Sequence, residues 1–118
     1  MKRAPRPASF VPLKPNWFHV LLSLADQEQH GYGIMQEVQR QSAGKYKLGP
    51  GTLYDNLQKM IERGLVEELG KRPGDDDPRR RYYRLSPLGR GVLSAEIARL
   101  DGVVREGKLR LETRPRRA

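Results

Sequence analysis

The sequence predicts a mainly α-helical fold that contains one small β-hairpin. Three segments with apolar residues at helical spacing come first, and two short strand-like segments follow around a loop rich in Gly, Pro and Asp. One more helical segment completes the order. The chain of 118 residues is long enough for one domain and leaves little room for a second.

The N-terminal segment is predicted to be an arm that leads into a buried helix. Residues 1–15 contain four prolines and scattered basic side chains, a composition typical of a flexible segment. Ordered structure is expected to begin near Asn16, which can cap a helix. Residues 17–24 are apolar around most of a helical circumference, so this helix should be buried on more than one side. Residues 27–31 are expected to form a polar connector.

Two amphipathic helices are predicted next. Residues 32–40 place apolar side chains at helical spacing, and Gly44 is expected to end this helix. Pro50 suits the first turn of the following helix, which we expect over residues 52–63. Gly64 occupies the position where a glycine commonly ends a helix.

The hairpin and a last helix occupy the remainder of the chain. Residues 65–69 and 81–85 are the predicted strands. Ser86 and Pro87 suit the cap and the first position of the last helix. We expect this helix to fray beyond about Arg105, because two glycines in its second half each cost about 0.5–1 kcal/mol relative to alanine.

The composition narrows the class of function. The formal net charge is +9, which favours a polyanionic partner such as nucleic acid. Residues 15–104, however, contribute only +1 to this net charge, because their basic and acidic residues nearly balance. The absence of cysteine excludes disulfides, thiolate zinc sites and iron–sulfur clusters, and it fits the reducing cytoplasm, where we expect the protein to associate with the nucleoid. No apolar run is long enough to span a membrane.

The third predicted helix carries the most informative surface. One side is an apolar stripe, and the other side has short polar residues at its N-terminal end. A helix that enters the DNA major groove needs such a face, on which Gln58 could read adenine and Lys59 could reach guanine or phosphate. The alternative is an ordinary solvated helix face. The polar side contains Gly51, Thr52, Asp55, Gln58, Lys59 and Glu62, with Tyr54 on its flank.

A basic hairpin directly after this helix favours DNA binding over the alternative. The combination is typical of a winged helix-turn-helix, in which the hairpin lies along the DNA backbone or in a minor groove. The basic residues are Lys71, Arg72, Arg79, Arg80, Arg81 and Arg84. The three aspartates at 75–77 would repel phosphate, and we expect them to pair with Arg79–Arg81 in the free protein. A solvated charged loop is the simpler alternative, and the aspartate triplet is only weak evidence for a divalent metal site.

Several blocks of sequence together resemble the PadR family of transcriptional regulators. The resemblance covers roughly residues 17–100 and depends on the segments LLSL at 21–24, HGYGI at 30–34, GTLY at 51–54, ERGLV at 62–66 and RYYRLSPLG at 81–89. It implies a winged helix-turn-helix fold that dimerises through a C-terminal helix. It also implies repression of promoters, often the protein's own, with release of DNA when a small molecule or another signal is bound.

The resemblance also implies roles for individual residues. Thr52 and Tyr54 match the recognition-helix motif, in which the tyrosine contacts the DNA backbone, and Tyr32 matches a further phosphate contact. Tyr82 and Tyr83 match the returning strand of the wing. Two features depart from the family pattern: Asp55 places a carboxylate on the DNA-facing side, and the tip of the wing is acidic.

The last helix is predicted to form the dimer. Leu93, Ile97, Leu100 and Val104 recur at the spacing of a helix seam, and Trp17 is placed near the interface by the family resemblance. A two-fold dimer would present two recognition helices ~34 Å apart and would therefore read a palindromic operator. The alternative is that the stripe packs only on its own domain.

Trp17 and Phe18 could form the aromatic floor of an effector pocket, or they could be ordinary core and interface residues. The first alternative implies a small-molecule effector that the sequence does not identify. Neither a cofactor nor a metal is expected. The expected division is a flexible basic arm at 1–15, a DNA-binding domain at 16–86, a dimerisation helix at 87–106 and a disordered basic tail at 107–118.

Two other classes of function are alternatives to sequence-specific DNA binding. An enzyme is not expected, because the sequence lacks a nucleophile with a base, a phosphate-binding glycine loop and recognisable paired carboxylates. The alternative function is a winged-helix module that binds a protein partner and has only non-specific affinity for DNA.

Overall fold

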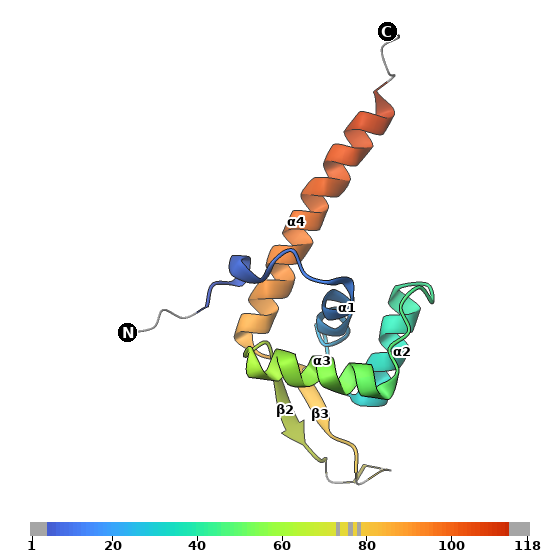
Figure 1. The fold of residues 1–118 in the computed structure, drawn as a ribbon, viewed down its shortest axis with the longest axis vertical. Coiled ribbons are helices and arrows are strands. Elements are labelled where there is room, and N and C mark those ends of the chain that lie inside the picture. Colours follow the sequence, from blue (N-terminus) through green and yellow to red (C-terminus); the bar gives the residue numbers. More distant parts are fainter. Residues whose placement is uncertain (1–4, 73, 76, 78, 114–118) are drawn as a thin grey trace.

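A computed structural model describes residues 5–72, 74–75, 77 and 79–113 of the chain. It is mainly helical, with one small antiparallel sheet, as predicted (Figure 1). The order of elements is η1 (Pro7–Phe10), α1 (Pro15–Ser23), β1 (Gln29–His30), α2 (Gly31–Gln41), α3 (Pro50–Glu62), β2 (Val66–Gly70), β3 (Tyr82–Leu85) and α4 (Pro87–Glu112).

The N-terminal segment differs from the flexible arm predicted over residues 1–15. Residues 7–10 form a short 3-10 helix, and the segment crosses α4 (Figure 1). Phe10 and Leu13 are partly buried against the core, and the Leu13 N–H donates a hydrogen bond of 2.7 Å to Glu96 Oε2. The apolar side chains explain the difference, because burying them against the core stabilises a segment that proline content alone predicts to be flexible. The first four residues lie outside the described part.

Helices α1, α2 and α3 surround the core. Their buried residues include Leu21 on α1, Ile34 and Val38 on α2, and Leu53 and Leu57 on α3. The helix bounds lie close to those predicted, although α1 begins at Pro15 with Lys14 as its cap rather than at Asn16. Because α3 buries only its apolar stripe, its polar side is left facing solvent.

The sheet contains one more strand than predicted. The strand order is β1-β3-β2 and both pairs are antiparallel, with Gln29 opposite Tyr83 and Val66 opposite Leu85. The two-residue strand β1 lies in the segment that was expected to be a polar connector. It is too short to show an alternating pattern in sequence, but it ties the start of α2 to the wing strand β3.

Helix α4 is longer than predicted and projects away from the rest of the molecule (Figure 1). The predicted end near Arg105 is wrong, because the helix continues to Glu112 and includes residues 107–112 of the expected disordered tail. Ion pairs at i,i+4 spacing, Arg105 with Asp101 at 2.7 Å and Arg110 with Glu106 at 3.6 Å, favour the helix where its glycines weaken it. Residues 114–118 lie outside the described part.

Candidate DNA-binding surface

The polar side of α3 is exposed along its length, as a recognition helix requires. Leu53, Leu57 and Met60 are buried on the opposite side of the helix. The exposed set contains all the α3 residues predicted to contact DNA, namely Gly51, Thr52, Tyr54, Asp55, Gln58 and Lys59. The side chains of this face have partners along the helix: Lys59 pairs with Asp55 at 3.1 Å, and the Gln58 amide donates to Glu62 at 3.3 Å.

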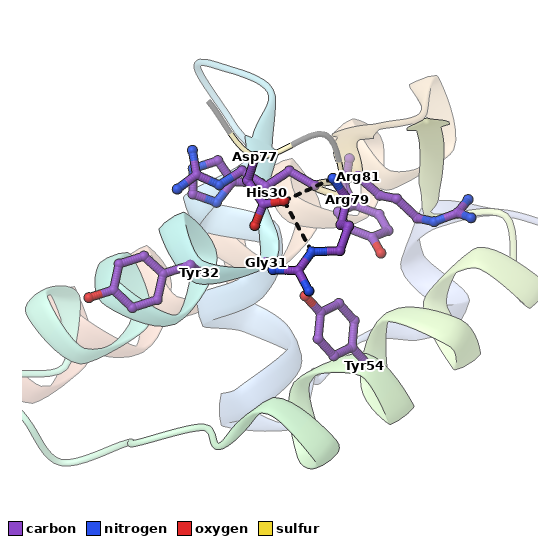
Figure 2. A pocket seen from close by; sticks show the side chains of 9 residues that line it. His30, Gly31, Tyr32, Tyr54, Asp77, Arg79 and Arg81 are labelled. Atoms are coloured by element: carbon purple, nitrogen blue, oxygen red, sulfur yellow. Dashed lines mark hydrogen bonds and ion pairs between the residues drawn. The ribbon is translucent and has the colours of Figure 1, made fainter. Parts of the chain in front are cut away.

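Tyr54 connects α3 to the start of α2. Its hydroxyl lies so close to Gly31 that a Cβ built on that glycine would be 2.3 Å from the oxygen. Figure 2 shows the Tyr54 ring rising from α3 toward Gly31, whereas Tyr32 projects outward from α2. Both tyrosines remain accessible, with 48% of Tyr54 and 59% of Tyr32 exposed. Each can therefore present a phenolic hydroxyl to a DNA phosphate.

A hollow of about 570 Å³ brings the two tyrosines together with arginines of the wing (Figure 2). It lies between the start of α2, helix α3 and the loop that precedes β3. Phenol and guanidinium groups in one concave surface suit the binding of phosphate. The residues that line it are His30, Gly31, Tyr32, Tyr54, Asp77, Arg79, Arg80, Arg81 and Tyr83.

His30 lines this hollow and has a structural role that the sequence analysis did not predict. Its Nδ1 accepts a hydrogen bond of 3.1 Å from the Gly33 N–H, so the side chain caps the N-terminus of α2. Burial lowers the pKa of His30, and the nearby Arg80 guanidinium acts in the same direction. The neutral imidazole is thus favoured, which is the form that can accept this bond.

The wing arginines are paired with carboxylates. Arg79 contacts Asp77 at 3.3 Å and Arg80 contacts Asp75 at 3.3 Å, which are two of the expected pairings. The backbone N–H and the guanidinium of Arg79 both donate to Asp77 and lower the pKa of its carboxyl group. The aspartate at 76 lies outside the described residues.

The remaining arginines pair with the strands and with the connector before β1. Arg81 pairs with Glu68 at 2.6 Å rather than with the aspartates, and Arg84 pairs with Glu67 at 3.1 Å. Arg72 pairs with Glu28 and lies 4.1 Å from the centroid of the Tyr82 ring. Of the predicted wing cations, Lys71 has no ion pair within the part of the chain that the structure describes.

Comparison with known proteins assigns this arrangement to a family. The model of the transcriptional regulator PadR-like family matches residues 20–95. The chain belongs to the PadR-like family. It is 35% identical over 88 residues to the transcriptional regulator Rv3488 of Mycobacterium tuberculosis. The matched region covers 75% of this chain and 78% of that protein.

Solved structures of PadR-like regulators share the fold. The match to one from Bacillus cereus has a TM-score of 0.70 at 19% identity and covers 83% of this chain and 92% of the Bacillus chain. The match to one from Clostridium difficile has a TM-score of 0.65 at 22% identity and covers 80% of this chain and 98% of the Clostridium chain. The winged-helix interpretation is therefore confirmed, and the chain belongs to a family of transcriptional regulators rather than of enzymes.

Two exposed lysines beside α3 of this PadR-like protein were not among the residues predicted to contact DNA. Lys45 and Lys47 are exposed in the connection between α2 and α3, just before the N-terminus of α3. The alternation of lysine with Tyr46 immediately before a predicted recognition helix is the signal that could have identified them.

The predicted effector pocket is only partly formed by the residues expected. Trp17 lines a second hollow of about 390 Å³, but Phe18 does not. Phe18 instead packs against the core, with its ring centroid 5.5 Å from that of His19. The second aromatic ring in the hollow comes from Phe10 in the N-terminal segment, which was expected to be a flexible arm.

The predicted dimer residues fall into two groups on α4. Leu93 is buried in the core of its own domain, because the first turns of α4 pack on the body of the molecule. Beyond them the helix is free, so Ile97 and Val104 are 46% and 50% exposed, and Leu100 is partly exposed. Trp17 is partly buried and donates a hydrogen bond of 2.9 Å from Nε1 to Asn56 Oδ1.

Within the described ranges, no three His, Cys, Asp or Glu side chains are grouped so that they could hold a metal ion. None of the helices in those ranges combines the length and apolar character needed to cross a membrane.

Proposed function

We propose that this PadR-like protein is a dimeric repressor that reads a palindromic operator at its own or a neighbouring promoter and is released by a small molecule. The observation that carries the proposal is the position of three features on one surface. Tyr32, Tyr54 and the wing arginines Arg79–Arg81 line one hollow, and the exposed polar side of α3 belongs to the helix that contributes Tyr54 to it.

Each part of this surface has a proposed role in the complex with DNA. Helix α3 enters the major groove, where Gln58 reads a base edge and Lys59 reaches guanine or phosphate. The backbone at Gly51 and Thr52 approaches a phosphate at the helix N-terminus. The two tyrosines and the cations Lys71, Arg72, Arg79, Arg80 and Arg81 contact the sugar-phosphate backbone, which fixes the position of the protein.

The exposed part of α4 is the proposed dimer interface. Ile97, Leu100 and Val104 form an apolar stripe beyond the point where α4 leaves its own domain. Pairing two such stripes removes them from water and relates two copies of residues 16–86 by a two-fold axis. A two-fold protein reads a two-fold DNA site, which supports a palindromic operator.

A second function is favoured by one observation. Each described arginine of the wing already has a carboxylate partner, so the wing presents less free positive charge than its sequence suggests. A winged-helix module that binds a protein partner and has only non-specific DNA affinity would need no further positive charge on its wing. This alternative is tested by the same experiment as the proposal.

Paired variants of the DNA-facing surface test the proposed roles. Against an operator selected from a random duplex pool, Gln58→Ala should lose about 1–3 kcal/mol of discrimination at one base pair in each half-site. Tyr54→Phe, which removes only a hydroxyl, should weaken binding to all sequences alike by roughly 1 kcal/mol. The exposed Gln39 on α2 offers a matched control, since Gln39→Ala should leave binding unchanged. Wild-type discrimination in Gln58→Ala would mean that another face of the protein reads the bases.

A further inference from the structure

The N-terminal segment connects two helices on which the proposed function depends. Phe10 and Leu13 are partly buried against the core, and the centroid of the Phe10 ring lies 5.0 Å from the guanidinium of Arg63, the residue at the C-terminal cap of α3. The short helix η1 packs on α4, where a Cβ built on Gly91 would be 2.9 Å from Cγ of Pro7. The segment therefore lies across α4 and reaches the end of α3 (Figure 1).

Helix α4 has a buried carboxylate where this segment crosses it. Glu96 is only 1% exposed, and its Oε2 accepts the hydrogen bond of 2.7 Å from the Leu13 N–H. Arg99 Nε donates to the other oxygen, Oε1, at 2.5 Å. The Arg99 guanidinium and the Leu13 N–H lower the pKa of Glu96 against the opposing effect of burial, so the side chain stays ionised. The carboxylate thus joins α4 to a segment that is 83 residues away in the chain.

A carboxylate at this position is explained better by geometry than by stability. Replacing a buried ion pair by apolar side chains of similar volume is often neutral or stabilising, so α4 does not need Glu96 in order to pack on the core. A hydrogen bond, unlike an apolar contact, weakens steeply when its angle changes. Glu96 is also the last buried residue of α4, and the helix beyond it projects from the body (Figure 1). Its bond to Leu13 therefore acts at the point that decides the direction of the free half.

We propose that Glu96, held by the Leu13 N–H, is a positioning residue that fixes the direction in which α4 leaves the DNA-binding domain and thereby sets the spacing of the two half-sites that the dimer accepts. The free half of α4 is the proposed dimer interface, so a turn of this helix at Glu96 would move the two recognition helices relative to each other. The inference rests on the proposed function, because it assigns a specificity-determining residue to the same dimeric reader of DNA.

A distance within one chain tests the direction of α4 without DNA. The sequence has no cysteine, so spin labels can be attached at Gln39→Cys on α2 and Glu106→Cys on α4, which are both exposed positions. Labelled chains diluted with unlabelled protein report this one distance by double electron–electron resonance, whether the protein is a monomer or a dimer. Glu96→Leu, which fills the site but removes the acceptor, should broaden the narrow distribution of the wild type. Glu96→Gln, which retains an oxygen for the Leu13 N–H, should stay close to the wild type.

Operators of altered spacing test the consequence for DNA reading. The duplexes carry the selected half-sites with one base pair added or removed between them, which moves a half-site by about 3.4 Å along the duplex and rotates it about the axis. The wild type and Glu96→Gln should lose affinity about tenfold or more, because a dimer with fixed helices reaches a displaced half-site only by deforming the DNA. Glu96→Leu should lose about threefold or less, because its α4 can turn in place of the DNA.

Val38→Ala is the control for lost stability, because it weakens the core from α2 and leaves the bond between Leu13 and Glu96 in place. Its distances and its spacing preference should match those of the wild type. An unchanged distribution in Glu96→Leu, or equal broadening in Val38→Ala, would overturn the positioning role. A Glu96→Leu protein that keeps the wild-type spacing preference would overturn the link to the operator. If the wild type selects no operator, the proposed function fails, and the distances alone decide the role of Glu96.

Discussion

At the level of single residues, glycine positions show how closely the elements of this fold approach one another. Gly89 lies in the first turn of α4, where its N–H donates to the capping Ser86 hydroxyl at 2.9 Å. A Cβ built on Gly89 would be 2.0 Å from the backbone oxygen of Leu65. Because a backbone atom cannot rotate away, only glycine permits α4 to pack on the start of the wing.

This packing predicts opposite effects for two substitutions in one helix. Gly89→Ala should lower the free energy of unfolding by about 1–3 kcal/mol, because the methyl group forces α4 away from Leu65. Gly102→Ala lies in open space on the exposed part of α4, where the gain in helix propensity should raise stability by about 0.5–1 kcal/mol. Denaturant titration of both variants gives the comparison. A Gly89→Ala variant as stable as the wild type would contradict the close packing of α4 on the wing.

For single residues, the sequence could predict side-chain exposure but not contacts between distant segments. The exposure of Tyr32 and Tyr54 followed from local motifs, because each motif fixes a helix and the side of it that faces solvent. The cap formed by His30 and the bond between Trp17 and Asn56 join segments whose proximity only the tertiary fold creates. No spacing rule could have identified them.

At the level of elements, arginines of the wing are neutralised by carboxylates of the same loop. Asp75 and Asp77 each contact an arginine of the same loop, and the Asp75 side chain is only 6% exposed. In the proposed complex, DNA phosphates replace these carboxylates as partners of Arg79 and Arg80. We therefore expect the acidic tip, which departs from the family pattern, to lower affinity for any DNA and to increase the dependence on correct base contacts.

Removing the carboxylates should therefore strengthen DNA binding. Asp75→Asn combined with Asp77→Asn should raise affinity for non-specific duplex roughly two- to tenfold, because two guanidinium groups lose competing partners. The control is Asp101→Asn on α4, which breaks a similar ion pair with Arg105 far from the wing. Fluorescence anisotropy with a scrambled duplex gives the affinities. If both variants bind like the wild type, the aspartates do not compete with DNA.

Element boundaries were predicted well where a helix stop or start was encoded locally, as at Gly64 and Ser86. They were predicted poorly where distant contacts or charge pairs decide the outcome. Strand β1 exists only because β3 pairs with it, and the last turns of α4 are helical despite Gly102 and Gly107.

At the level of the whole molecule, the free half of α4 is the feature that a single copy leaves unexplained. Ile97 and Val104 face solvent on a helix that projects beyond the body, with the additional exposed apolar residues Val103, Leu109 and Leu111. Apolar side chains in such a stripe are stabilised by burial against a second surface. The sequence predicted the stripe from its spacing, but it could not show that Leu93 belongs to the core.

A charge on this stripe should produce a monomer. Ile97→Glu places a carboxylate in the proposed interface, whereas Ala98→Glu places one outside the apolar stripe, about 100° around the helix from Ile97. Sedimentation velocity should show a dimer for the wild type and for Ala98→Glu and a monomer for Ile97→Glu, with circular dichroism to verify folding. A dimeric Ile97→Glu protein would place the interface elsewhere.

The most direct test of the central claim is a mobility-shift titration of the selected operator duplex against scrambled competitor at two salt concentrations. A dimeric reader of DNA sequence predicts a complex that survives excess competitor at both salt concentrations and a protected region with two-fold symmetry. A complex that competitor abolishes and that disappears at the higher salt concentration would show binding by charge alone. That result would contradict the account and favour the partner-binding winged helix.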